Sequence, residues 1–228
     1  MRKIFLWLFI LFCLSPPWIR ADEEAVRYLD AIEKKYSGLK DYIADVNVHF
    51  DMETFKTPDM QAKLYFKAPD KLKVESKGVF FFPREGGYFN PALFKKDDFE
   101  IRILEPVAEG KKDIKLKIVP KKKEKMGREF ILLIDRNDNL VREIHTSQFD
   151  GRETKARIEY GRYGSFELPR YILLTLDLPS VDPNEKRGFG PFEQKSERVT
   201  GTIEITYANY KVNTGLKDEI FNPRETKK

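Results

Sequence analysis

The chain has 228 residues, with 42 Lys and Arg against 37 Asp and Glu, which gives a formal net charge of +5. Three of the basic residues, Arg2, Lys3 and Arg20, lie within residues 1–21, which we expect to be an N-terminal leader, and without them 39 basic residues oppose 37 acidic ones. The remaining charge of +2 gives little reason to expect a nucleic-acid-binding protein. The single cysteine, Cys13, also lies in the leader, so the rest of the chain has no thiol for disulfides or metal sites.

Residues 1–21 have the organisation of a secretory signal peptide. Two basic residues precede an apolar run from Ile4 to Leu14, and two prolines then lead to Ala21. The run is shorter than the roughly 20 residues that span a bilayer. We expect export and cleavage after Ala21, with retention as an uncleaved anchor as the alternative. Residues 22–228 are then expected to form one domain, because no repeat or low-complexity linker divides them.

Residues 22–36 predict an amphipathic helix. Acidic residues at its start and Lys34 and Lys35 near its end suit the helix dipole. One stripe of this helix is apolar and contains Ala25, Leu29, Ile32 and Tyr36. The stripe must pack on another element, and the nearest candidate is the sheet that begins at Tyr42.

Three antiparallel strands are predicted between Tyr42 and Glu75, where apolar and polar residues alternate and Pro58 and Pro69 mark two turns. Alternation with a period of two places the apolar side chains on one face of the sheet. We expect this face to line an apolar cavity. The candidate cavity residues are Val46, Val48, Phe50, Leu64, Phe66, Leu72 and Val74.

The next segment, residues 78–94, is rich in aromatic side chains that glycines and prolines interrupt. Two interpretations remain open for it. It is either an ordinary packed hairpin or a mobile flap over a binding cavity, since aromatic side chains supply a large contact area. The candidate lid residues are Phe80, Phe81, Phe82, Tyr88 and Phe89.

The alternation continues through the rest of the chain. Lys121–Lys125 predicts a solvated hairpin loop, with a patch for anionic lipid heads or an acidic partner as the alternative. Phe130–Ile134 is apolar on both faces and predicts a central strand, whereas residues 180–200 predict a long loop. The further strands are expected at 99–103, 114–118, 130–134, 140–149, 156–160, 171–178 and 202–212.

The area of such a sheet has a consequence for the fold. About ten strands at 4.8 Å spacing present a face of roughly 950 Å², whereas a helix of about 15 residues covers only about 220 Å². The sheet must therefore curl, and loops or a ligand must fill the apolar hollow that remains. We predict a mostly β (α+β) protein, with a single antiparallel sheet curled into an unclosed β-barrel around the N-terminal helix and an apolar cavity inside.

An enzyme is not expected. His49 lies on the polar face of its predicted strand, and the sequence places no carboxylate or serine that we can pair with His145. The sequence also has no Gly-rich phosphate loop, no nucleophile elbow and no metal-binding His-Glu spacing. We therefore predict no catalytic residue, no metal site and no cofactor.

A series of short motifs, in this order along the chain, resembles the periplasmic lipoprotein carriers of the LolA/LolB type. The resemblance extends over essentially the whole chain after residue 21. The motifs are Tyr36-Ser-Gly-Leu-Lys-Asp-Tyr42, Leu64-Tyr-Phe-Lys-Ala-Pro-Asp-Lys-Leu-Lys-Val-Glu75, Lys117-Ile-Val-Pro-Lys121, Ile134-Asp-Arg-Asn-Asp-Asn-Leu140, Asp150-Gly-Arg-Glu-Thr154 and Tyr207-Ala-Asn-Tyr-Lys-Val-Asn213.

This resemblance implies an exported periplasmic carrier, a monomer that binds lipoprotein acyl chains or lipids in an apolar cavity. Such a carrier moves its cargo toward the outer membrane as a chaperone, between membrane donor and acceptor proteins. The chain departs from the best-known carriers by a long insertion at 181–198 and by few helices after the first. The alternative is an envelope-stress sensor or regulator that shares the fold and binds a protein partner.

Overall fold

The computed structural model describes residues 17–52, 56–78, 98–104, 112–121, 128–148, 152–179 and 198–222. Within these ranges the chain forms one long helix, ten strands and a short 3₁₀ helix. In chain order they are α1 (Pro17–Tyr36), β1 (Asp41–Met52), β2 (Met60–Lys67), β3 (Lys71–Ser76), β4 (Phe99–Ile103), β5 (Asp113–Pro120), β6 (Arg128–Asp135), β7 (Leu140–Gln148), β8 (Glu153–Tyr163), β9 (Phe166–Pro179), β10 (Arg198–Val212) and η3 (Asp218–Phe221).

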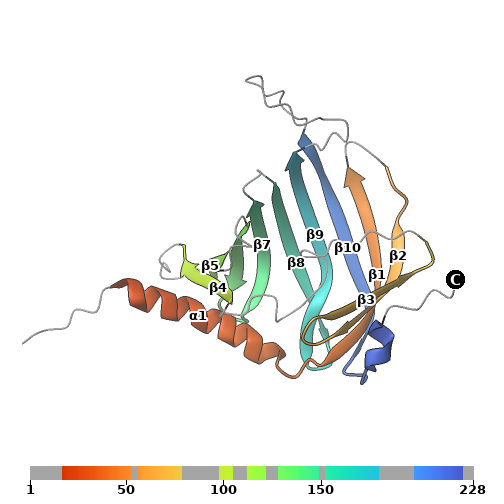
Figure 1. Ribbon diagram of the computed structural model, residues 1–228, viewed down its shortest axis with the longest axis horizontal. Helices are drawn as coiled ribbons and strands as arrows, with labels where there is room; N and C mark the ends of the chain where they lie inside the picture. Colours follow the sequence, from red (N-terminus) through yellow and green to blue (C-terminus); the bar gives the residue numbers. More distant parts are fainter. Residues whose placement is uncertain are drawn as a thin grey trace, which may run out of the picture.

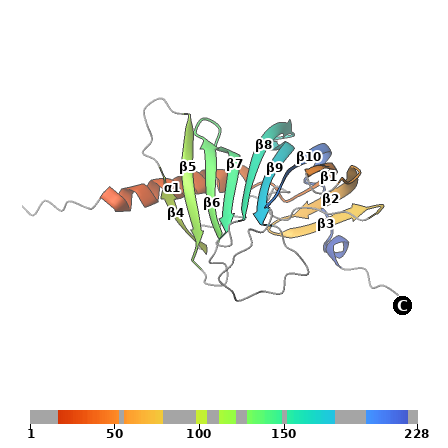
Figure 2. The ribbon, with the colours of Figure 1, turned by 90° about the horizontal axis from the view of Figure 1, so that it is seen from above.

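All ten strands belong to one antiparallel sheet, in the order β3-β2-β1-β10-β9-β8-β7-β6-β5-β4. The last strand returns to pair with the first, so β1 and β10 lie side by side inside the sheet (Figure 1). The two edges are β3 and β4, and the sheet does not close on itself. Seen from above, the strands twist progressively from β4 to β3 (Figure 2). The prediction of a mostly β fold with one open antiparallel sheet and an N-terminal helix is confirmed.

The apolar face of the sheet forms the core of the protein. In β1, Tyr42, Ala44, Val46, Val48 and Phe50 are buried, and the residues between them face the other side. The same alternation buries side chains of β5, β6, β9 and β10 in a single continuous cluster. This alternation is what the period of two in the sequence predicts, because successive side chains of a strand point to opposite faces.

Helix α1 packs at the β4 side of the sheet (Figures 1 and 2). It begins at Pro17, five residues before the predicted start, and proline suits the first position of a helix because it has no N–H to satisfy. Its predicted apolar stripe is buried as expected. Tyr36 anchors its end by donating a hydrogen bond to the carbonyl of Glu167, at 2.7 Å. In the described part of the chain, no helix is both long and apolar enough to cross a membrane.

Several strands extend beyond their predicted bounds, and the start of β9 does so by the most. Strand β9 begins at Phe166, well before the predicted Tyr171, and includes Pro169. A shift of register between Glu159 and Tyr160 of β8 lies beside this proline, and such bulges tolerate a residue without an N–H. The prediction that Phe130–Ile134 forms a central strand is confirmed, because β6 is an internal strand that pairs with β5 on one side and β7 on the other.

Asp41, at the start of β1, binds the segment that follows β10. Its side chain is 2% exposed and accepts four hydrogen bonds from the segment after β10. The N–H and hydroxyl of Thr214 donate to Oδ1 at 2.7 and 3.0 Å, and the N–H groups of Gly215 and Leu216 donate to Oδ2 at 3.0 and 3.2 Å. The carboxylate thereby satisfies backbone donors that no strand pairs, and holds this segment against the start of β1.

Replacing Asp41 with Asn is expected to destabilise the protein by about 2–3 kcal/mol. The amide keeps one acceptor oxygen and replaces the other carboxylate oxygen with an NH₂ group, a donor that faces the backbone N–H donors. Denaturant unfolding of the two proteins measures the change. Asp51→Asn is the matched control, since Asp51 lies exposed on the same strand, and it should change stability by less than about 0.5 kcal/mol. Equal stability of Asp41→Asn and the wild type would contradict the role given to this carboxylate.

Candidate functional site

The seven predicted cavity residues lie together on the apolar face of the sheet. Between β2 and β3, Leu64 lies opposite Val74 and Phe66 lies opposite Leu72. Between β1 and β10, the register continues the same rows into the last strand. There Val46 faces Tyr207, Val48 faces Ile205 and Phe50 faces Ile203. The seven positions and their β10 partners therefore form one apolar surface across four neighbouring strands.

Burial of this apolar surface falls toward the edge of the sheet. Val48, Leu64 and Phe66 have no exposed surface. Leu72 and Val74, on the edge strand β3, are only half-buried although both pack against the core. The surface is therefore closed at its centre and accessible along β3, which has no neighbouring strand on its outer side within the described residues.

A cluster of aromatic rings, which the sequence did not predict, adjoins this surface. Tyr42 stacks on Phe66 with ring centroids 5.0 Å apart, and Tyr210 lies 5.5 Å from Tyr42 and 4.4 Å from Tyr163. The Tyr210 hydroxyl donates to the carbonyl of Pro169 at 2.8 Å, and burial raises its pKa well above the usual value. The rings therefore form a mostly apolar wall in which the Tyr210 hydroxyl already has a partner.

The predicted lid residues Phe80, Phe81, Phe82, Tyr88 and Phe89 lie outside the described residues. The same is true of most of the lysine run at 121–125 and of the expected loop at 180–197. Their roles stay predictions.

The opposite face of the sheet carries ion pairs, and here the interpretation of His145 needs correction. Its Nε2 lies 3.1 Å from Glu143, which also pairs with Lys155 at 2.9 Å and Arg157 at 3.2 Å. Partial burial acts to raise the pKa of Glu143, but the hydrogen bonds from Lys155, His145 and Arg157 outweigh it and lower this pKa to about 2. His145 thus has the carboxylate partner that the sequence interpretation denied it. The arrangement is a charge cluster with several cations on one carboxylate.

The prediction that His49 is a solvated surface residue is confirmed, since its side chain is 49% exposed. Its Nδ1 lies 2.7 Å from Asp59, and this hydrogen bond raises the pKa of the imidazole. Across the described ranges, no group of three or more His, Cys, Asp or Glu side chains is placed to hold a metal ion.

Comparison with known proteins gives a likeness in fold. No family model matches the sequence, and no curated protein matches it in sequence. An outer membrane lipoprotein-sorting protein domain from Vibrio parahaemolyticus superposes with a TM-score of 0.60 and 12% identity, over 88% of this chain and 97% of that one.

Two further solved structures agree with the first. A LolA superfamily protein from Nitrosomonas europaea gives a TM-score of 0.54 at 10% identity, over 87% of this chain and 97% of that one. A DUF1329 family protein from Desulfovibrio piger gives 0.56 at 12% identity, over 91% and 98%. Together with the open ten-stranded sheet and its single N-terminal helix, these likenesses show that the chain has the LolA-like fold.

Proposed function

We propose that this protein is an exported carrier that binds the acyl chains of lipoproteins or lipids and moves them across the periplasm toward the outer membrane. The main support is the apolar surface of β1, β2 and β3, which is buried at its centre and half-buried along the edge strand. The likeness in fold to a lipoprotein-sorting domain supports the same function.

The chemistry of this surface suits a cargo that must be both held and released. An apolar chain gains roughly 0.8 kcal/mol for each methylene group that leaves water. A chain of about 16 carbons that buries half of its methylenes therefore gains roughly 6 kcal/mol without any directional bond. Such binding depends on contact area alone, so a partner that offers a larger apolar surface can take the chain over.

The entrance to this surface is proposed at β3, where Leu72 and Val74 leave part of their apolar area accessible. Exposed apolar area at a sheet edge is unfavourable in water and becomes favourable when a chain covers it. The aromatic residues Phe80 to Phe89 follow β3 directly in the sequence. Of the two interpretations of this segment, a carrier favours the flap, in which these residues cover the bound chain.

Replacing Leu72 with Gln should weaken palmitate binding about tenfold, because a polar amide replaces apolar contact area at the proposed entrance. Titration calorimetry at several temperatures measures the affinity, and the wild type should bind with a negative heat-capacity change. Lys73→Gln is the matched control on the opposite face of the same strand and should bind palmitate as the wild type does. A wild-type protein that binds no palmitate, or a Leu72→Gln variant with unchanged affinity, would refute the carrier.

The N-terminal segment provides a second expected outcome. If residues 1–21 are an export signal, the protein should be recovered from the periplasmic fraction with its first residue at or near Asp22. Cell fractionation followed by N-terminal sequencing checks both points. Recovery of the intact N-terminus in the membrane fraction would instead favour an anchored protein.

A further inference from the structure

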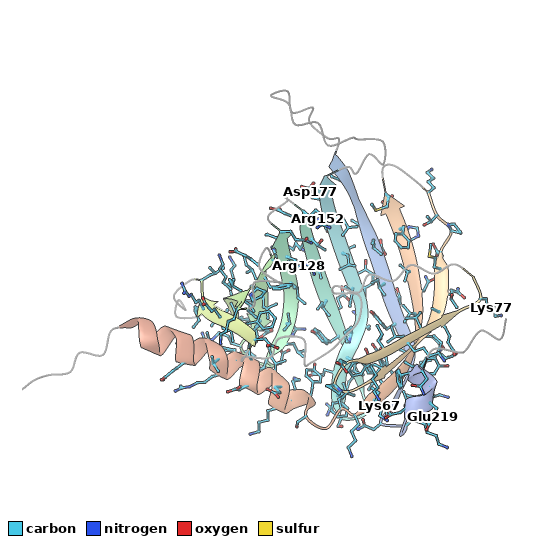
Figure 3. All side chains as sticks on the ribbon, in the orientation of Figure 1. Lys67, Lys77, Arg128, Arg152, Asp177 and Glu219 are labelled. Atoms are coloured by element: carbon cyan, nitrogen blue, oxygen red, sulfur yellow. The ribbon has the colours of Figure 1, made fainter. Side chains whose placement is uncertain are left out.

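The outer edge of β3 borders a hollow of about 590 Å³. Its lining consists of the consecutive residues 72–76 of β3, together with Phe221 at the end of η3 and Asn222 directly after it. Successive side chains of a strand point to opposite faces, so a hollow above one face would meet only every second residue. A hollow that meets consecutive residues therefore runs along the backbone edge of the strand. Figure 3 labels Lys77 at one end of this edge.

This edge lacks the features that usually prevent edge strands from pairing, which are a proline, a bulge or a lysine that reaches across the edge. Strand β3 contains no proline, and its pairing with β2 has no shift of register. Its two lysines are held elsewhere. Lys71 pairs with Asp218 at 3.0 Å, and Lys73 pairs with Glu75 at 2.7 Å and lies over the ring of Tyr65. The other edge of the sheet, β4, packs against α1.

An open strand edge selects a polypeptide as its partner. Alternate residues of an edge strand direct their N–H and C=O groups outward, and an extended peptide satisfies them by pairing as one more strand. At about 3.4 Å per residue, residues 72–76 offer an edge of about 17 Å, which matches a peptide of about five residues. An acyl chain has no donors or acceptors for these groups. The hollow beside the edge therefore suits a peptide rather than a second lipid chain.

The side chains of β3 favour a peptide with alternating apolar and acidic residues. An added strand would place every second side chain beside Leu72 and Val74, on the apolar face. The others would lie on the polar face, where cations exceed carboxylates. There Lys67, at 2.6 Å, and Lys71 share the carboxylate of Asp218, and no carboxylate among the described residues pairs with Lys77. Acidic side chains of the peptide would reduce this excess of positive charge.

We propose that the β3 edge binds an extended, acidic polypeptide segment as an added strand, and that this segment belongs to a lipoprotein cargo, next to its acyl chains. Leu72 and Val74 lie both at the entrance of the apolar surface and along the edge, so the two parts of such a cargo meet the protein at one strand. The proposal rests on the carrier function and narrows it, because it selects a lipoprotein over a free lipid.

The test measures by calorimetry how the full-length protein binds an N-palmitoylated pentapeptide amide with the sequence Ser-Val-Asp-Val-Asp. A second form, methylated on the valine and aspartate backbone nitrogens, keeps the acyl chain and the charges but cannot pair as a strand. The unmethylated form should bind about tenfold tighter, because main-chain hydrogen bonds supply the affinity of an added strand. A form with lysine in place of both aspartates should bind roughly threefold more weakly at low salt.

Amide hydrogen exchange provides a readout at the edge itself. The outward amides of β3 should exchange quickly in the free protein and about tenfold more slowly in the complex with the unmethylated peptide. The methylated peptide should leave their exchange unchanged. Slow exchange of these amides in the free protein would mean that another part of the chain or a second copy already pairs with the edge, and would overturn the proposal. Sedimentation of the free protein would then identify a second copy.

A steric variant separates the edge from the apolar surface. Asn222 lies exposed in the lining, so Asn222→Trp should fill the hollow and remove the preference for the unmethylated peptide. Its palmitate affinity and melting temperature should equal those of the wild type. Glu219→Trp is the matched control, because Glu219 is exposed on η3 outside the lining, and it should keep the preference.

Failure of this proposal and failure of the carrier function give different results. If palmitate binds but the two peptide forms bind equally, or Asn222→Trp keeps the preference, the added strand is overturned and the carrier stands. If palmitate and both palmitoylated peptides fail to bind, the carrier function is refuted, and the assignment of the peptide to a cargo is overturned with it.

Discussion

The structure depends on one constraint, which is that a ten-stranded sheet has a single apolar face and its helix is too small to cover that face. Helix α1 packs against the β4 side, where its apolar stripe is buried. Among the described residues it is the one long helix, so the half made by β1, β2, β3 and β10 receives no such cover from it. The side chains at the centre of this half, such as Val48, Leu64 and Ile205, are nevertheless buried, and only Leu72 and Val74 on β3 keep partly accessible apolar area. That accessible edge is where the proposed apolar cargo would gain contact.

The pairing of β1 with β10 fixes which strands form this half. Because the first and last strands are neighbours, residues far apart in sequence form the same rows, such as Val48 with Ile205. The register of that pair is held at one end by the Asp41 carboxylate, which binds the backbone after β10. A register slip of one residue would turn the apolar side chains of β1 to the polar face. The carboxylate therefore contributes to the apolar surface without touching it.

The alternation in the sequence was enough to predict the strands, their apolar face and the helix stripe, because each of these is a local pattern. The partners that a side chain contacts across the sheet were not predictable in the same way. Asp41 looks like any acidic residue before an apolar run, since its partners lie up to 175 positions later in the chain. Glu143 and His145 are two residues apart on one strand, so alternation alone would have placed them on the same face. Lys155 and Arg157 join them only through the register of β7 with β8.

Strand β9 was predicted too short because a proline normally argues against a paired strand. Pro169 is tolerated here because the bulge in β8 lies beside it.

The two sides of the sheet differ in how completely their side chains are partnered and buried. On the side of β7 and β8, the carboxylate of Glu143 is satisfied by three cationic or hydrogen-bonding partners, and the helix covers part of the apolar face near β4. On the side of β1 to β3, Leu72 and Val74 keep partly accessible apolar area along the edge strand. Such area is unfavourable in water and becomes favourable when an apolar molecule covers it. Natural proteins keep such local costs mainly where binding offsets them, so the edge of the sheet at β3 is where the proposed apolar cargo would meet the protein.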